Sequence, residues 1–142
     1  MVDGQQTREG SKNDFGKERF DLIPPQPLFE LANLYAIGAR KYEDRNWEKG
    51  LKWGRVFAAM MRHAWKFWGG EFYDRECLNS KCVDENGVRT ILPKEAGKNR
   101  LLKCNQCGDN GVRAPHLASV AWCAFTLLEY TNTHQELDDR SV

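Results

Sequence analysis

Three segments of the chain carry apolar residues at helical spacing, and this pattern constrains the fold more than any other feature. The first segment begins at Pro27, which suits the first turn of a helix, and extends to about Tyr42. The second begins near residues 53–55, and the third begins at Pro115 and ends near Tyr130. Three such segments predict an all-α fold, in which the helices form a bundle around one core.

The spacing also predicts which side chains are buried. In the first helix one stripe is expected to be buried, formed by Leu28, Leu31, Tyr35, Gly38 and Tyr42. In the third helix Cys123 lies among apolar neighbours and is expected to be a small core residue. The second helix has more Trp and Phe than one core requires, which predicts further burial against a partner subunit.

Length and charge exclude several classes of protein. A chain of 142 residues corresponds to one domain, and its net charge of +1 provides no general attraction for nucleic acid or membranes. No apolar run approaches the ~18 residues that a membrane span needs, and the polar N-terminus has no signal-peptide core. We therefore expect a cytoplasmic protein, in which thiols stay reduced.

Four cysteines form two close pairs, Cys77 with Cys82 and Cys104 with Cys107. In a reducing compartment, such pairs favour a tetrahedral zinc ion over disulfides, although four free thiols remain the alternative. The surrounding residues 76–112 are rich in Lys, Asn and Gly, and a short strand is expected there at Val88, Thr90 and Ile91, paired with Leu101 and Leu102. The sequence thus predicts an inserted zinc-ribbon-like β-hairpin module.

The resulting domain organisation has four parts. Residues 1–17 are expected to be a flexible N-terminus, and residues 18–75 with 113–134 a helical catalytic domain. Residues 76–112 form the inserted cysteine-rich module, and residues 135–142 form a polar tail.

An acidic pair, Glu71 and Asp74, follows the tryptophan-rich second helix. If the helix continues through Gly69 and Gly70, the two carboxylates share one face and are typical of a magnesium site; a kink after Gly69, or a solvated helix end, is the alternative. Glu30 could supply a third ligand or be an ordinary surface residue.

Histidines and basic residues supply further candidates. His63 and His116 could act directly, although a lone helical histidine is more often only hydrogen-bonded. The charged loop after the first helix could contact phosphates, or it could be a solvated charge run; Trp47 in it could stack on a base or anchor the loop. The candidate substrate-binding residues are Arg19, Lys41, Arg45, Asn46, Trp47 and Lys49. No phosphate-binding loop of the GKS type, nucleophile elbow or dinucleotide fingerprint is present in the sequence.

Four runs together resemble a known family. They are RFDLIPP at 19–25, LFELANLYAIGARKYEDRNWEKGL at 28–51, RHAWKFWGGEFYD at 62–74 and PHLASVAWCAFTLLEY at 115–130. In combination they resemble the phage dATP/dGTP diphosphohydrolases, the MazZ-type relatives of the all-α MazG and HisE pyrophosphohydrolases. The resemblance covers nearly all of the chain outside the first residues and the cysteine module.

The resemblance implies a MazG-like helical bundle that forms dimers or tetramers. It also implies hydrolysis of a purine deoxynucleoside triphosphate to the monophosphate and pyrophosphate, in control of a phage nucleotide pool, with Mg²⁺ or Mn²⁺ held by ExxE and ExxD motifs. Glu71-x-x-Asp74 matches ExxD, whereas Glu30-x-x-Asn33 matches only the first half of ExxE. His116 begins HLAS, where relatives often read HLAH, and is a further candidate metal ligand.

The two metal classes are expected to separate, because hard carboxylate oxygens suit magnesium and thiolates suit zinc. The cysteine module joins Asp74 to His116, so it could be a structural clip or a lid over the site. Two rival functions are a zinc-ribbon module that binds nucleic acid and a non-catalytic phage interaction protein. The near-zero net charge argues against nucleic acid as the main partner.

Overall fold

Three long helices and one small sheet make up the protein in the computed structural model, which describes residues 10–77, 81–83, 85, 101–104, 107 and 110–142. The helices are α1 (Pro25–Lys41), α2 (Trp53–Trp68) and α3 (His116–Thr133). This architecture confirms the predicted helical bundle with a small β module. Within the described part of the chain, no helix is both long and apolar enough to cross a bilayer.

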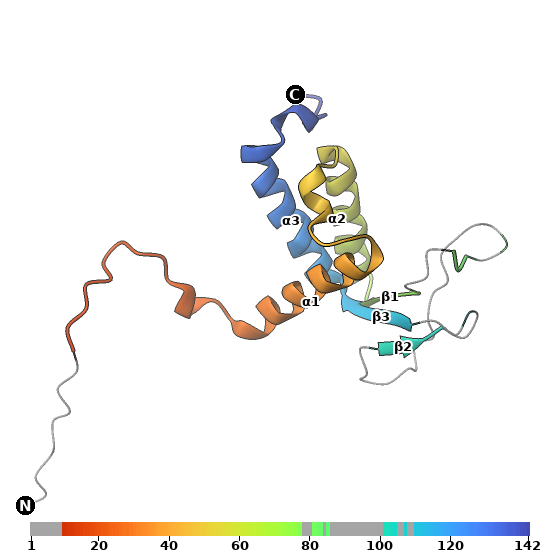
Figure 1. The fold of residues 1–142 in the computed structure, drawn as a ribbon, viewed down its shortest axis with the longest axis horizontal. Helices are drawn as coiled ribbons and strands as arrows, with labels where there is room; N and C mark the ends of the chain where they lie inside the picture. Colours follow the sequence, from red (N-terminus) through yellow and green to blue (C-terminus); the bar gives the residue numbers. More distant parts are fainter. Residues whose placement is uncertain (1–9, 78–80, 84, 86–100, 105–106, 108–109) are drawn as a thin grey trace, which may run out of the picture.

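Helix α3 is the centre of the bundle. It packs along α2 and also contacts α1, which crosses the lower end of that pair (Figure 1). The main core forms between α2 and α3 and contains Trp53, Val56, Cys123 and Tyr130. The prediction that Cys123 is a small core residue is therefore confirmed.

The buried stripe predicted for α1 is partly wrong. Leu31 is buried as expected, but Leu28 is 50% exposed and Tyr42 is 66% exposed. Leu28 lies in the first turns of α1, which point away from the other helices (Figure 1). Tyr42 lies just beyond the end of the helix, where the backbone leaves helical geometry. The second buried residue of α1 is Ile37, which packs against Ala114 of the sheet.

The segment after α2 is a strand, so of the alternatives that the sequence left open, continuation of the helix through the glycine pair is wrong. Helix α2 ends at Trp68, and Gly70 has a φ of +97°, a conformation that glycine adopts without strain. The chain turns at this residue and enters strand β1 (Tyr73–Cys77). Glu71 and Asp74 therefore do not lie on one helical face.

The small sheet has the strand order β1-β3-β2, with both pairings antiparallel. Strand β3 (Asn110–Pro115) is central, and β2 (Leu101–Lys103) pairs with it on the far side from β1. Leu101 and Leu102 are thus in a strand as predicted, whereas residues 88, 90 and 91 lie outside the described residues. The sheet begins at Tyr73 and ends at Pro115, so it includes the edges of the predicted helical domain.

The predicted polar tail packs back onto the bundle. The backbone N–H of Gly54 donates to Asp139 Oδ1 over 2.7 Å, and the guanidinium of Arg140 lies 4.8 Å from the ring centre of Trp53. Two short 3-10 helices accompany these contacts, Asn46–Lys49 in the loop after α1 and Gln135–Leu137 in the tail. The hydroxyl of Tyr130 donates to the carbonyl of Trp47, which ties that loop to α3.

Candidate active site

A line of three side chains links α2, α3 and the turn after α2. The Nδ1 atoms of His63 and His116 lie 2.9 Å apart, and Nε2 of His116 lies 2.9 Å from Oε1 of Glu71. His116 is fully buried, while Glu71 is about half exposed. Because each ring nitrogen of His116 faces a different partner, the orientation of this imidazole is fixed from both sides.

Asp74 joins the two histidines at the end of the sheet. One donor atom each from His63, Asp74 and His116 lie within 4.8 Å of one another, close enough to share one metal ion. We call these three residues the His–Asp–His group. A carboxylate and two imidazoles together are a donor set that divalent transition metals accept.

Strand pairing brings Asp74 to His116, although they are 42 positions apart in the sequence. Asp74 pairs with Ala114 in β3, and the backbone N–H of His116 donates to the carbonyl of Phe72 over 2.9 Å. The first residues of β1 therefore lie beside the junction of β3 and α3. Histidine 63 comes from the last two turns of α2, which packs along α3.

The two predicted acidic ligands approach the same histidine by a different route from the one expected. Glu71 lies in the turn after α2, and its carboxylate lies within hydrogen-bond distance of His116. Asp74 lies in β1 and belongs to the His–Asp–His group. Their roles as metal ligands stay predictions.

Glu30 lies apart from this arrangement. It is half-buried on α1, its Oε1 accepts a hydrogen bond from Nε2 of Gln26 over 3.2 Å, and it belongs to neither of the two metal-capable groups among the described residues. The structure therefore does not bring Glu30 into the His–Asp–His group.

A cavity of about 640 Å³ opens next to the His–Asp–His group, and His63 belongs to its wall. Its lining comes from the second half of α1, the loop that follows, one face of α2 and one face of α3. The lining residues are Leu34, Tyr35, Ile37, Gly38, Ala39, Lys41, Tyr42, Glu43, Asp44, Arg45, Asn46, Trp47, Leu51, Arg55, Ala59, His63, Ser119, Trp122 and Cys123.

Most of the predicted substrate-binding residues lie in this wall, namely Lys41, Arg45, Asn46 and Trp47. Lys49 and Arg19 are not among the lining residues. Lys49 is paired with Glu43, and Arg19 forms a two-armed ion pair with Asp21 that lowers the pKa of that carboxyl. Arg45 also has an acidic neighbour, because its guanidinium lies 2.9 Å from Oε1 of Glu48.

Sequence reasoning missed several residues of the wall. Arg55 was not among the candidate binding residues, yet it lines the cavity together with Ala59 and His63. These three positions are spaced by four residues, so they share one face of the helix, and that spacing was a usable signal. Trp122 was also missed; its ring lies 6.2 Å from that of Tyr35, whose pKa burial raises.

The cysteines form a second group, which lies between Asp74 and His116 in the sequence. Cys82, Cys104 and Cys107 each offer a sulfur within 4.8 Å of the others. Cys77 is the last residue of β1.

Comparison with known proteins identifies the family. A family model described as "dATP/dGTP diphosphohydrolase, N-terminal" matches residues 7–140. A protein of Salmonella phage PMBT28 named "dATP/dGTP diphosphohydrolase" is 44% identical over 54 residues, which are 38% of this chain and 18% of that relative. The match thus spans less than a fifth of the relative's length, and no solved structure matches the chain. Because the family model covers nearly the whole chain, the protein belongs to the dATP/dGTP diphosphohydrolase N-terminal family.

Proposed function

We propose that the protein hydrolyses a purine deoxynucleoside triphosphate, dATP or dGTP, to the monophosphate and pyrophosphate with the help of a divalent cation, and so controls a nucleotide pool. The observation that carries the proposal is the position of His63, which belongs both to the His–Asp–His group and to the wall of the cavity. A ligand in the cavity would therefore lie beside the metal-capable residues.

The rest of the cavity wall suits a nucleotide. Lys41, Arg45 and Arg55 are cations that can offset the charge of a triphosphate, and they come from α1, the loop and α2. Trp47 and Trp122 present aromatic rings, on which a base can stack. The volume of about 640 Å³ also falls in the range of roughly 300–1,000 Å³ that small-molecule sites occupy.

The donor set decides which cation fits. Magnesium prefers oxygen ligands, whereas the His–Asp–His group offers two imidazoles and one carboxylate. We therefore infer that Mn²⁺ or a similar transition ion suits these residues better than Mg²⁺. Such an ion supplies positive charge against the triphosphate and makes water a better nucleophile.

Glu71 has a positioning role in this proposal. An ionised carboxylate only accepts hydrogen bonds, so Nε2 of His116 donates to Glu71 and Nδ1 keeps its lone pair for a cation. Carboxylates orient metal-binding histidines in this way in many proteins, and their loss weakens metal affinity by about 10–100-fold. Glu71→Ala should therefore weaken Mn²⁺ binding, while Glu71→Gln, whose amide oxygen can still accept, should weaken it less.

Pyrophosphate release from dATP and dGTP, measured with Mn²⁺ and with Mg²⁺, tests the proposal. Asp74→Asn removes the only carboxylate of the His–Asp–His group and should lower release by about 100-fold or more. The matched control is Glu129→Gln, which makes the same change of charge at an exposed site on α3. A wild-type protein that releases no pyrophosphate, or an Asp74→Asn variant as active as the control, would overturn the proposal.

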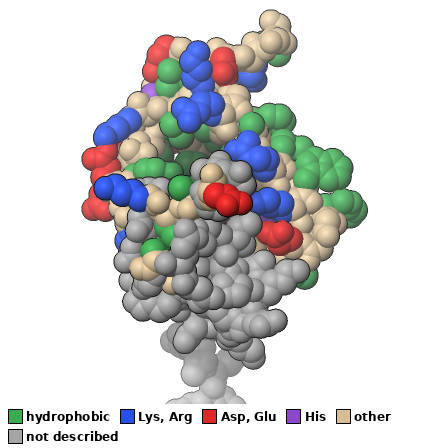
Figure 2. Space-filling model, turned by 90° about the vertical axis from the view of Figure 1, so that its right-hand side faces the viewer, with side chains coloured by type: hydrophobic (Ala, Val, Ile, Leu, Met, Phe, Trp, Pro, Cys, Tyr) green, Lys and Arg blue, Asp and Glu red, His purple; other side chains and the backbone are tan. Residues whose placement is uncertain are grey.

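We also propose that the protein forms a homo-oligomer, a dimer or tetramer, through the outer face of α2. Phe57, Met61, Trp65 and Trp68 follow the spacing of one helical face, and Arg55, Ala59 and His63 occupy a different face that lines the cavity. Trp65 is 65% exposed and Trp68 is 79% exposed. Exposed hydrophobic side chains also gather at one edge of the surface in Figure 2.

Apolar surface of this kind favours association, because burial removes it from water. Light scattering after size exclusion should give a mass above that of the 16.4 kDa chain. Trp65→Lys should shift the mass toward the monomer, whereas Lys66→Ala, a substitution at the adjacent exposed position, should not. A monomeric wild-type protein would contradict this assignment.

A further inference from the structure

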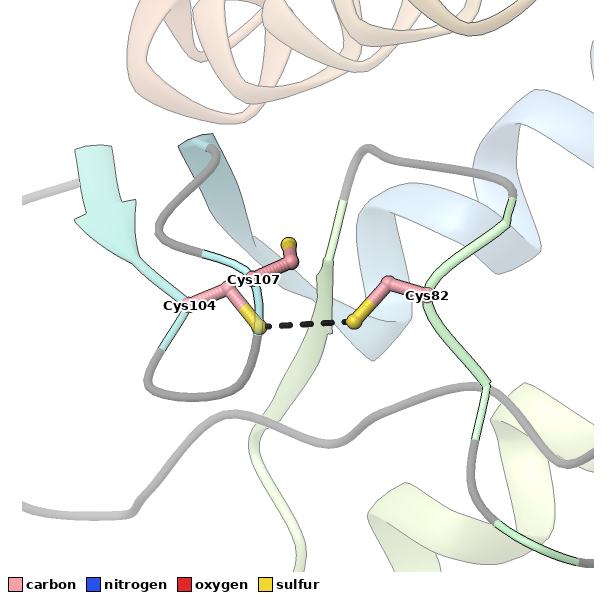
Figure 3. Close-up of side chains that lie close together, drawn as sticks. All are labelled: Cys82, Cys104 and Cys107. Atoms are coloured by element: carbon pink, nitrogen blue, oxygen red, sulfur yellow. Dashed lines mark hydrogen bonds between the residues drawn. The ribbon is translucent and has the colours of Figure 1, made fainter.

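Three thiols from separate segments converge beyond the end of the sheet. Cys82 follows β1, Cys104 follows β2, and Cys107 lies in the connection to β3 (Figure 3). Cys82 and Cys104 are buried at 5% and 2% exposure, and their sulfurs lie 3.7 Å apart. All three sulfurs lie within 4.8 Å of one another.

The distance between the sulfurs excludes a disulfide and fits both a thiol hydrogen bond and coordination of one metal ion. A disulfide holds its sulfurs about 2.05 Å apart, which is far shorter than the separation of Cys82 and Cys104. Two thiolates on one tetrahedral zinc ion, each with a Zn–S bond of about 2.3 Å, lie about 3.8 Å apart. The observed 3.7 Å agrees with this value.

We propose that Cys82, Cys104 and Cys107 bind one structural zinc ion. Thiolates select zinc over the hard cations magnesium and calcium, and three sulfurs from three segments are typical of a structural site. Cys107 is exposed, which would give an ion access to the two buried thiols. The fourth ligand is assigned from the sequence to Cys77, which ends β1 five residues before Cys82.

The position of the ion gives it a defined role in the fold. Its ligands follow β1, follow β2 and precede β3, so the ion would tie together all three strands of this small sheet. Asp74 lies near the opposite end of β1, three residues or about 10 Å along the strand from Cys77. At that same end of the sheet, β3 leads directly into His116. The zinc would thus hold the register that brings Asp74 to His116, without contacting the substrate.

This inference does not rest on the proposed function. Its test is the zinc content of the purified protein, which does not require nucleotide hydrolysis. Protein purified without added metal should contain about one zinc ion per chain by elemental analysis. Replacement with Co²⁺ should produce the charge-transfer absorbance of cobalt thiolates. Cys104→Ser should lose the zinc and the absorbance, whereas Cys123→Ala, a change in the helical core, should retain both.

Because Cys107 is exposed, a substitution there tests zinc binding without disturbing a buried side chain. Cys107→Ser should weaken zinc binding by at least about 100-fold, and Cys107→His, which restores a zinc ligand, should recover most of it. Cys77→Ser should weaken zinc binding in the same way. A selective zinc chelator should lower the melting temperature of the wild-type protein but leave that of Cys104→Ser unchanged.

Two results would overturn the inference: wild-type protein that binds no zinc under reducing conditions, or Cys104→Ser protein that retains zinc as tightly as the wild type. Neither result depends on whether the protein hydrolyses a nucleotide, so a failure of the zinc site and a failure of the proposed function are distinguishable.

Discussion

The Nδ1 atoms of His63 and His116 face each other across the α2–α3 interface at 2.9 Å. One of the two nitrogens must carry the hydrogen and the other must accept it. Because His116 already has Glu71 at Nε2, its Nδ1 is the acceptor when Glu71 is ionised, and Nδ1–H of His63 is the donor. A cation in the His–Asp–His group would take the place of that hydrogen.

Alanine substitutions at the two histidines should lower the free energy of unfolding by different amounts, although both should lower activity. His116 is fully buried between two partners, so His116→Ala should lower the free energy of unfolding by about 2–4 kcal/mol. His63 borders the cavity, where water can replace it, so His63→Ala should cost about 1 kcal/mol. Urea denaturation measures both values, and pyrophosphate release should fall in both variants. Equal losses of stability would contradict this difference in environment.

The hydrogen bond from Tyr130 to the Trp47 carbonyl should support the cavity loop. Tyr130→Phe keeps the ring beside His134 but leaves the carbonyl without this donor, so the free energy of unfolding should fall by about 1–2 kcal/mol. The KM for the nucleotide should rise more than kcat falls, because Asn46 and Trp47 line the cavity. Tyr42→Phe, at an exposed tyrosine, should leave the free energy of unfolding unchanged.

Gly50 is required where the loop after α1 meets the C-terminal segment. Its φ is +88°, and an added Cβ would lie 2.5 Å from Cδ1 of Leu137 and 2.6 Å from Cδ2 of His134. Gly50→Ala should therefore combine backbone strain with a steric clash and cost about 2–5 kcal/mol.

Gly70→Ala is the matched control for this prediction. Gly70 has a similar φ of +97°, but nothing lies within 4 Å of the position that its Cβ would take. This variant should show only the strain, about 1–2 kcal/mol, in the same denaturation experiment. If Gly50→Ala were no more destabilising than Gly70→Ala, the close approach of Leu137 would not matter energetically.

The helices were predictable because their signals are local. Apolar spacing and Pro115 were enough to place α3 within a few residues, and the same holds for α1 and α2. The exposure of Leu28 and Tyr42 was not predictable in this way, because it depends on how far α1 extends past its neighbours. Periodicity indicates which face is apolar, but not where the packing partner ends.

The site was predictable in its residues but not in its geometry. Glu71, Asp74 and His116 were all identified as candidates, yet their proximity depends on the pairing of β1 with β3. That pairing joins segments separated by the cysteine module and leaves no periodic signal in the sequence. The glycine pair left open whether the helix would continue or end, and the positive φ of Gly70 is the physical reason that the chain turns there.

Cys123 should make the stability of the helical core depend on alkaline pH. Burial raises the pKa of its thiol from 9.0 to about 11, so the folded protein holds this proton more tightly than the unfolded chain does. The stabilisation is fully present below pH 9 and is lost as the pH rises from about 9 to about 11. Burial raises the pKa of Tyr130 as well, which adds a loss of the same sign above pH 10.

Cys123→Ala removes the thiol contribution and keeps that of the tyrosine. The variant should be less stable than the wild type at pH 7, because it leaves a small cavity, but its free energy of unfolding should change less between pH 9 and pH 10. Urea denaturation at a series of pH values measures both slopes. Parallel slopes for the two proteins would show that the Cys123 thiol titrates alike in the folded and unfolded states.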